Sequence, residues 1–470
     1  MNTKLKTYIA LLTLAILASC KVTEKKATPQ LPLPEAYRNV ANTDTTNIAD
    51  IQWKTFFTDA ALQKLIDSAI ANNYDMQAAL KNIESAQLIV KQTKLGYLPD
   101  VKLQAAASIT RPSDNSLNGL SLSQYLGKSY VEDYNINAAV SWEADIWGKI
   151  KNQKAKALAE YLQTTEAKKA IQTNLVAFVA KGYYNLLMLD AQLGIAQKNL
   201  LLNDSTLHII TLQYQAGQVT LLAVQQAEAQ RLVAVQLVPF LQQNITIQEN
   251  ALSVLTGVQP GTIERTGSIN NIVFTDKLSS GLPSALVSNR PDVKSYELAL
   301  DIANAKTGIA KAGMYPSLTI TATGGLNSFK ASNWFNIPAS LFGTVAGGIT
   351  QPLFQRKQLK TQYELAKVDR ERTVIQFRQS VLTAVGEVAD ALVKTDRLKE
   401  QQDIATTRVG TLKQAISNAD LLFRNGMANY LEVITAQSNV LQGELELASI
   451  KKDKLNAVVE LYKALGGGWK

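Results

Sequence analysis

The chain has 470 residues, 46% of them hydrophobic, and a formal net charge of +9. This length supports a large core but allows two or three domains, so the number of domains must be inferred from other features of the sequence. Basic residues are dispersed among acidic ones, without a Lys/Arg block interleaved with aromatics, which argues against a nucleic-acid partner. The single cysteine, Cys20, and the single histidine, His208, exclude an intrachain disulfide, a thiolate metal cluster and a His-based metal site.

The first twenty residues predict a secretion signal. Lys4 and Lys6 precede the apolar run YIALLTLAIL, which is about half as long as a membrane-spanning helix. The run ends in LASC, which resembles the lipobox of bacterial lipoproteins, where the cysteine is acylated and becomes the first residue. We therefore expect residues 1–19 to be a lipoprotein signal peptide and Cys20 to carry a covalent lipid, with no other cofactor. The Lys- and Pro-rich stretch that follows predicts a tether, so residues 20–58 are expected to be a lipid-anchored N-terminal segment.

The remainder consists of two copies of one pattern. A stretch beginning at Tyr74 aligns without gaps on one beginning at Pro291. The shared residues include Asp75 with Asp292, Lys94 with Lys311, Gly96 with Gly313, and Pro99 with Pro316. In each copy a helical pattern stops at the Gly and Pro, because proline lacks an amide donor and disfavours helical geometry before it, and an alternating pattern follows. We therefore predict helix-to-strand junctions at these two Gly and two Pro positions.

Each copy contains two alternating runs, which predict strands at about 101–111, 134–145, 317–327 and 341–352. Alternation over about ten residues with aromatic ends is typical of outer-membrane barrel strands, which turn one face to lipid and the other to a water-filled lumen. An antiparallel sheet on a soluble core fits a single strand equally well. Four strands cannot close a barrel, and an open edge in lipid leaves backbone groups unpaired, so several chains must pool their strands. A trimer would supply twelve.

Two long helices follow the strands of each copy, at about 148–256 and 355–465, with turn signals at Gly217 and Gly426. Apolar or small residues repeat in steps of three and four over roughly seven heptads of the second copy, which predicts a left-handed supercoil against neighbouring helices. A helix from about Gln355 to Leu422 would be roughly 100 Å long. No compact globular domain requires that length.

Together these features resemble the TolC-like outer-membrane efflux proteins, in the lipoprotein branch that works with resistance-nodulation-division pumps. The motifs that carry the resemblance are the lipobox, the duplicated helix–strand–strand–helix–helix unit, SWEADIWGKI, GMANYLEVITAQ and the terminal VELYKALGGGW. The resemblance implies a mostly α chain with membrane β structure, whose homotrimer forms a 12-stranded outer-membrane β-barrel continuous with a long periplasmic α-helical barrel. The implied domains are an N-terminal segment at 20–58, a first repeat at 59–257, an equatorial segment at 258–290, a second repeat at 291–466 and a tail at 467–470.

The function that the resemblance implies is that of a passive exit duct of a tripartite efflux system. The duct would be lipid-anchored in the outer membrane of a diderm bacterium and would project into the periplasm. Its partners would be outer-membrane lipid, a periplasmic adaptor (membrane fusion) protein and an inner-membrane resistance-nodulation-division transporter. The adaptor would meet the helix tips at Gly217 and Gly426.

The resemblance also implies a periplasmic gate at the start of the last helix. In the lipoprotein branch a Leu and, one turn later, an Asp close the pore as rings. Leu431 stands at the Leu position, but Thr435 stands at the Asp position, which is a departure from the family pattern. Glu432 offers a substitute carboxylate ring that would favour cations, or it is an ordinary solvated glutamate on a helix face.

No pair of acids is set apart as acid and base, and a Ser-His-Asp arrangement would depend on His208 alone, so we expect no enzyme. The alternative class is a lipid-anchored periplasmic coiled-coil scaffold or adaptor, in which the alternating runs form a small sheet. Lumen residues such as Asn135, Thr319 and Thr321 are polar and unspecialised, so drugs, metal ions and metabolites all remain open as substrates.

Overall fold

The computed structural model describes residues 48–272, 274 and 289–470. The expected signal peptide, the lipid site at Cys20 and residues 273 and 275–288 of the expected equatorial segment lie outside these residues. The described residues divide into two compact units. The first unit contains Ser85–Leu162 and Leu298–Ile375, and the second contains the other described residues.

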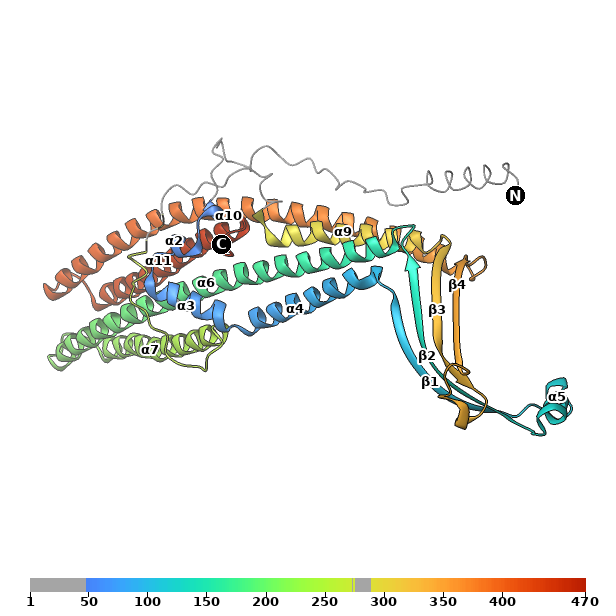
Figure 1. The fold of residues 1–470 in the computed structure, drawn as a ribbon. Helices are drawn as coiled ribbons and strands as arrows, with labels where there is room; N and C mark the ends of the chain where they lie inside the picture. Colours follow the sequence, from blue (N-terminus) through green and yellow to red (C-terminus); the bar gives the residue numbers. More distant parts are fainter. Residues whose placement is uncertain (1–47, 273, 275–288) are drawn as a thin grey trace, which may run out of the picture. The chain divides into compact units, whose positions relative to one another are not determined.

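The first unit holds one antiparallel sheet with the strand order β1-β2-β3-β4 (Figure 1). The strands are β1 Asp100–Thr110, β2 Val131–Ala144, β3 Ser317–Ser328 and β4 Leu341–Thr350, all within three residues of the expected ranges. The pairing of β2 with β3 joins the two repeats. Among the described residues no strand lies beyond β1 or β4, so these two form the edges of the sheet.

The register reproduces the internal repeat. Val101 lies opposite Val140 in the first repeat, and Leu318, the residue that aligns with Val101, lies opposite Ile349 in the second. Between the repeats, Val140 lies opposite Ala322. All these residues therefore lie on one face of the sheet, because side chains alternate between faces along each strand.

Short elements complete the first unit. The connection from β1 to β2 carries α5 Leu117–Leu126, whose N-terminus is capped by the Ser116 hydroxyl, which accepts from the amide of Gly119 at 3.1 Å. The connection from β3 to β4 carries the short 3-10 helix η4 Ala331–Asn333. The helices α4 Tyr74–Lys94 and α9 Pro291–Ala312 precede the first strand of each repeat, and the 3-10 helix η2 Leu95–Tyr97 follows α4.

The long helices are α6 Lys149–Gln215, α7 Leu221–Leu255, α10 Gln358–Arg424 and α11 Tyr430–Ala464. In α10 the buried residues follow the heptad steps read from the sequence. They are Phe377, Val381, Ala384, Val388, Ala391, Ala405, Val409 and Phe423. Although α6 and α10 have 67 residues each, none of the helices in the described ranges is both long enough and apolar enough to cross a membrane.

The start of the described chain packs on the long helices of the second unit. It contains the 3-10 helix η1 Ile48–Asp50, α2 Trp53–Phe56 and α3 Ala60–Asn72. Asp59 caps α3, accepting from the amides of Ala61 and Leu62, and also accepts from the Tyr183 hydroxyl of α6 at 3.1 Å. The Tyr462 ring of α11 stacks on Phe56 with 4.0 Å between centroids, and burial raises the pKa of Tyr462 to about 12.

Candidate functional site

The four-stranded sheet has two chemically distinct faces. One face is mainly apolar, with Glu132 and Ser328 as its polar members near the strand ends. Its other residues are Val101, Leu103, Ala105, Ala107, Ile109, Tyr134, Ile136, Ala138, Val140, Trp142, Ala144, Leu318, Ile320, Ala322, Gly324, Leu326, Leu341, Gly343, Val345, Gly347 and Ile349. The other face is lined mainly by Asn, Gln, Ser and Thr, and on it Asn327 donates to the Asp133 carboxylate at 2.8 Å. Leu103 and Val345 are 78% and 80% exposed, so the apolar face lacks a covering layer in the first unit. Such a sheet suits contact with lipid on one face and water on the other.

The motif SWEADIWGKI, which spans the end of β2 and the start of α6, contacts both helix-to-strand junctions. The indole nitrogen of Trp142 donates to the carbonyl of Tyr97 at 2.8 Å, beside the junction at Gly96 and Pro99. The indole nitrogen of Trp147 donates to the carbonyl of Pro316 at 2.6 Å, at the second junction. The motif therefore lies between the two junctions and hydrogen-bonds to each.

The same motif starts α6. The Asp145 carboxylate accepts from the amides of Ile150 and Lys151 at 2.9 and 2.8 Å, which satisfies two of the free donors at the helix N-terminus. Gly148 has a φ of 74°, a conformation that favours glycine. Gly96 lies close to this helix, because a Cβ atom there would approach Ile150 to 3.2 Å.

The hairpin tips of the two repeats have the same turn. Gly217 and Gly426 have φ values of 74° and 71°. The amide after each glycine bonds to a carbonyl five residues earlier, Gln218 to Gln213 and Met427 to Leu422, both at 2.8 Å. This is the pattern of a helix that ends at a left-handed glycine, so each glycine sets the sharp return of the chain.

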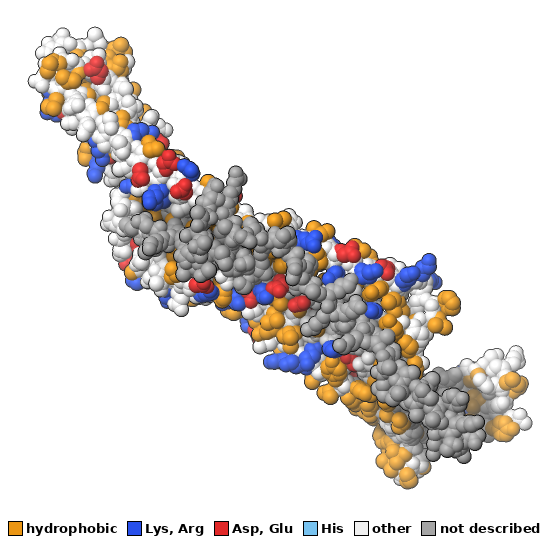
Figure 2. All heavy atoms as spheres, turned by 90° about the horizontal axis from the view of Figure 1, so that it is seen from above, with side chains coloured by type: hydrophobic (Ala, Val, Ile, Leu, Met, Phe, Trp, Pro, Cys, Tyr) orange, Lys and Arg blue, Asp and Glu red, His pale blue; other side chains and the backbone are white. Residues whose placement is uncertain are grey.

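A shared core joins the two tips. It contains Ile210, Ala223, Ala227, Phe423, Val433 and Ile434. The Tyr430 hydroxyl donates to the side-chain carbonyl of Gln226 at 2.8 Å across the same contact. Outside this core, apolar side chains stay exposed, among them Leu222 at 57% and Met427 at 69%. Figure 2 shows several hydrophobic side chains among uncharged ones at this end of the helices, whereas basic and acidic side chains are interspersed over the middle of the helices on the face in view.

The three expected gate residues occupy one face of the first turns of α11. Leu431, Glu432 and Thr435 are exposed, whereas Val433 and Ile434 are buried in the tip core. The Asn429 side chain caps the helix by accepting from the amide of Glu432 at 3.1 Å. The exposed face is therefore free of contacts from the tip core and is available to a neighbouring molecule or a pore axis.

Arg290 is a buried charged residue that connects three helices and that the sequence analysis did not identify. Its side chain is 8% exposed and binds Asp292 at 2.6 Å and Glu387 of α10 at 2.6 Å. It also donates to the carbonyl of Ala464, the last residue of α11, at 3.1 Å. One guanidinium therefore connects the start of α9 with α10 and the end of α11. Burial opposes ionisation of Asp292, but the hydrogen bond and charge of Arg290 outweigh it and hold the Asp292 pKa below its usual value.

The equivalent position of the first repeat is Asn73. Its side-chain amide donates to the carbonyl of Leu255 at the end of α7 at 3.0 Å, and its oxygen caps α4. In both repeats a side chain therefore connects the end of a hairpin helix, α7 or α11, to the start of the helix that leads to the sheet, α4 or α9. In the first repeat the contact is made by the neutral amide of Asn73, and in the second by the charged guanidinium of Arg290. The only hint of this contact in the sequence was the position of Arg290 directly before Pro291 and Asp292, at the start of a predicted helix.

Comparisons with known proteins agree with this architecture. The family described as outer membrane efflux protein matches residues 65–258 and 282–467, which is more than half of the chain. The solvent efflux pump outer membrane protein SrpC of Pseudomonas putida is 30% identical over 441 residues, covering 94% of this chain and 92% of SrpC. The probable outer membrane lipoprotein SilC of Salmonella typhimurium is 25% identical and covers 98% of both chains.

A solved channel structure has the same fold. The open state of the MtrE outer membrane channel of Neisseria gonorrhoeae matches with a TM-score of 0.85 and 25% identity, covering 96% of this chain and 99% of MtrE. These matches span nearly the whole chain and give no support to the periplasmic scaffold that the sequence left open. The chain therefore belongs to the outer membrane efflux protein family and is an outer-membrane efflux channel.

Proposed function

We propose that three copies of this chain form the exit duct of a tripartite efflux system. The observation that carries the trimer is the sheet, which has one exposed apolar face and two edges, β1 and β4, without a neighbouring strand in the described chain. In a bilayer each unpaired backbone group costs several kcal/mol, so the edges must pair. Four strands are too few to close around a lumen, whereas three copies supply twelve.

Conductance and oligomeric state test this proposal. The full chain is expected to run as heat-modifiable trimers in outer-membrane fractions and to give conductance steps in a planar bilayer. Cys20→Ser removes the proposed lipid but leaves the sheet, so this variant is expected to stay trimeric and to need detergent. A Cys20→Ser protein that is monomeric in buffer without detergent would contradict the duct and support the scaffold.

The partners belong to the same proposal. A duct without an energy source needs an inner-membrane transporter, and we assign that role to one of the resistance-nodulation-division class, bridged by a periplasmic adaptor. The exposed apolar side chains beside Gly217 and Gly426, such as Leu222 and Met427, support docking of the adaptor at the helix tips. Acylation at Cys20 would tether the N-terminus to outer-membrane lipid.

We assign the periplasmic constriction to Leu431, with Glu432 beside it and Thr435 one turn further along. Replacing Leu431 and Glu432 together by Ser is expected to raise single-channel conductance several-fold, because a ring of three leucines and three carboxylates is replaced by small hydroxyls. Glu432→Gln alone is expected to reduce cation preference with little change in conductance. Both are measured in planar bilayers.

Gln442 provides the control for the gate. It is exposed on α11 and, eleven residues after Leu431, lies on nearly the same face of the helix about three turns away. Gln442→Ser is expected to leave conductance unchanged. An unchanged channel in the Leu431 and Glu432 double variant would place the constriction elsewhere.

A further inference from the structure

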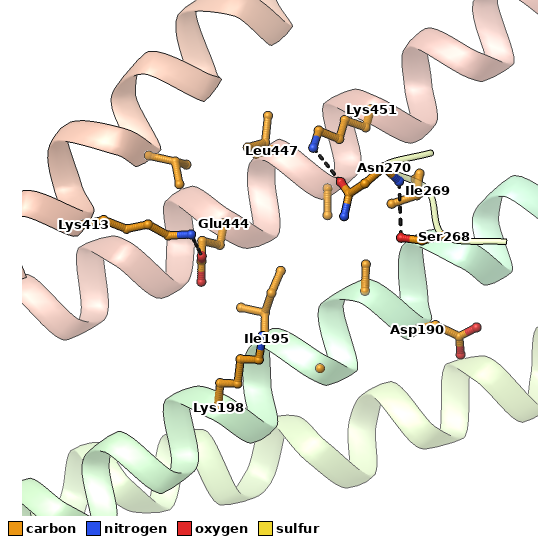
Figure 3. Close-up of a pocket in the computed structure, with 14 residues that line it drawn as sticks. Asp190, Ile195, Lys198, Ser268, Ile269, Asn270, Lys413, Glu444, Leu447 and Lys451 are labelled. Carbon is orange, nitrogen blue, oxygen red and sulfur yellow. Dashed lines mark hydrogen bonds and ion pairs between the residues drawn. The ribbon is translucent and has the colours of Figure 1, made fainter. Parts of the chain in front are cut away.

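A cavity of about 430 Å³ lies in the second unit between α6, α10, α11 and the segment around Ser268 to Asn270 (Figure 3). Three lysines line it, each from a different helix: Lys198 of α6, Lys413 of α10 and Lys451 of α11. None of them belongs to the sheet, the hairpin tips or the expected gate. The cavity is therefore a feature that the efflux channel itself does not explain.

The carboxylates at this cavity are already engaged. Asp190 binds Arg265 through both oxygens, at 2.6 and 3.1 Å, and Glu444 pairs with Lys413 at 2.6 Å. Across the described ranges, neither Lys198 nor Lys451 forms an ion pair with a carboxylate. The cavity therefore keeps two positive charges without a negative partner.

Lys451 is the less exposed of these two lysines. Its ammonium donates to the side-chain carbonyl of Asn270 at 2.6 Å, which is a neutral acceptor (Figure 3). Burial and the nearby charge of Lys413 lower the pKa of Lys451. An anion beside Lys451 would offset both effects. Ser268 lines the same cavity and carries a hydroxyl that could donate to an anion.

The rest of the lining is apolar. Ile195 of α6 and Leu447 of α11 lie on the wall, and Ile269 of the 268–270 segment is buried beneath it. Gly194 also lines the wall, and a Cβ atom there would meet nothing within 4 Å. The cavity is thus much larger than a bare inorganic ion needs, and its apolar wall is adjacent to the lysines.

We infer that this cavity binds a phosphate-class oxyanion that carries a short apolar group. The oxyanion lies at the ammonium of Lys451, Lys198 adds a second positive charge to the same cavity, and the apolar group contacts Ile195 and Leu447. Lysine acts as a flexible point charge and suits phosphate without demanding the fixed geometry of a bidentate site. The source is either a free phosphate monoester or the headgroup of a phospholipid. The inference does not depend on the trimer or on the gate.

Hexyl phosphate is the probe, and binding to the purified full-length protein in detergent is measured by isothermal titration calorimetry. Wild-type protein is expected to bind one hexyl phosphate per chain, about tenfold more tightly than inorganic phosphate, because the alkyl group is buried. Hexanol is not expected to bind. The Lys198→Gln and Lys451→Gln double variant is expected to lose at least about tenfold in affinity, because charge-assisted contacts are removed.

Two further variants separate the charge from the shape of the cavity. Lys198→Arg with Lys451→Arg keeps both charges and is expected to retain binding. Gly194→Leu narrows the cavity and also favours the helix, so it is expected to weaken hexyl phosphate binding more than inorganic phosphate binding. The far-ultraviolet circular dichroism spectrum and thermal transition of each purified variant, measured without ligand, check that it folds.

Lys399→Gln is the matched control, because Lys399 is exposed on α10 without an ion pair in the described chain. It is expected to bind hexyl phosphate as the wild type does. Binding that appears only after phospholipid is stripped from the protein would identify a lipid headgroup as the source and support the site. Equal loss in the Lys399 variant, or hexyl phosphate binding no better than hexanol binding, would overturn it.

Discussion

Val345→Arg is expected to abolish most of the outer-membrane trimer. Val345 lies in the middle of β4 on the apolar face and is 80% exposed in the single chain, so the arginine would have to lie in hydrocarbon. A basic side chain at the bilayer midplane costs about 2–4 kcal/mol per chain. The measurement is the yield of heat-modifiable trimer in outer-membrane fractions, with total protein followed by immunoblot.

Thr344→Arg is the matched control for this prediction. Thr344 is the preceding residue of β4, and its side chain lies on the opposite, polar face. Its arginine would project into water, so the trimer is expected to assemble and only its ion selectivity to change. Equal loss of trimer in both variants would show that the apolar face does not contact lipid.

Arg290→Met is expected to destabilise the second unit by about 3 kcal/mol per chain. The side chain is 8% exposed, and removing one partner of a buried ion pair costs about 3–5 kcal/mol. The side chains of Asp292 and Glu387 are about half exposed, at 48% and 47%, so water can solvate their carboxylates when Arg290 is removed. We therefore expect a cost at the lower end of that range. The measurement is the urea midpoint or the temperature of trimer dissociation. Arg397→Met, at a 63% exposed position of α10, is the control and is expected to cost under about 1 kcal/mol.

The contribution of Asp292 to stability also depends on pH. Its pKa is lowered in the folded chain, so its stabilising effect is present at neutral pH and is lost as the pH falls below the usual range near 4. In Arg290→Met the lowering by Arg290 is removed, and burial, which favours the protonated carboxyl, is opposed mainly by the backbone amide of Val293 that donates to Asp292. The difference in stability between wild type and variant is therefore expected to shrink on acidification from pH 7 to pH 3. A constant difference would show that the loss comes from packing and not from charge.

The local pattern of the sequence was sufficient to predict the strands and long helices. Alternation defined the apolar and polar faces, and the heptad steps of α10 identified side chains such as Val381 and Val388 that are buried. These features depend on residues close in the chain, where periodicity and backbone geometry act together. The gapless repeat added the two junctions, because it showed the same Gly and Pro spacing twice.

The contacts between distant segments could not be predicted in the same way. Trp142 and Trp147 stand in a motif that the sequence singled out, but their acceptors are 45 and 169 residues away. Arg290 reaches Glu387 and Ala464, 97 and 174 residues along the chain. No periodicity records such pairs, because they depend on how the repeats pack together. The roles of Leu431, Glu432 and Thr435 as a gate stay predictions, since they require neighbouring copies.

The duplicated register has a consequence for how a ring would close. Because the two repeats pair alike internally, the contact between β2 and β3 is a template for the contact between β4 and the β1 strand of the next copy. In the repeat, Ile349 of β4 is equivalent to Val140 of β2, and Ala105 of β1 is equivalent to Ala322 of β3. Because Val140 pairs with Ala322, the template places Ile349 opposite Ala105 of the next copy. Both residues are on the apolar face, so the seam continues the lipid-facing surface without interruption. Each chain thus carries an edge that complements its own opposite edge. In the proposed trimer this head-to-tail interface would generate a closed ring with quasi-sixfold symmetry from three identical subunits.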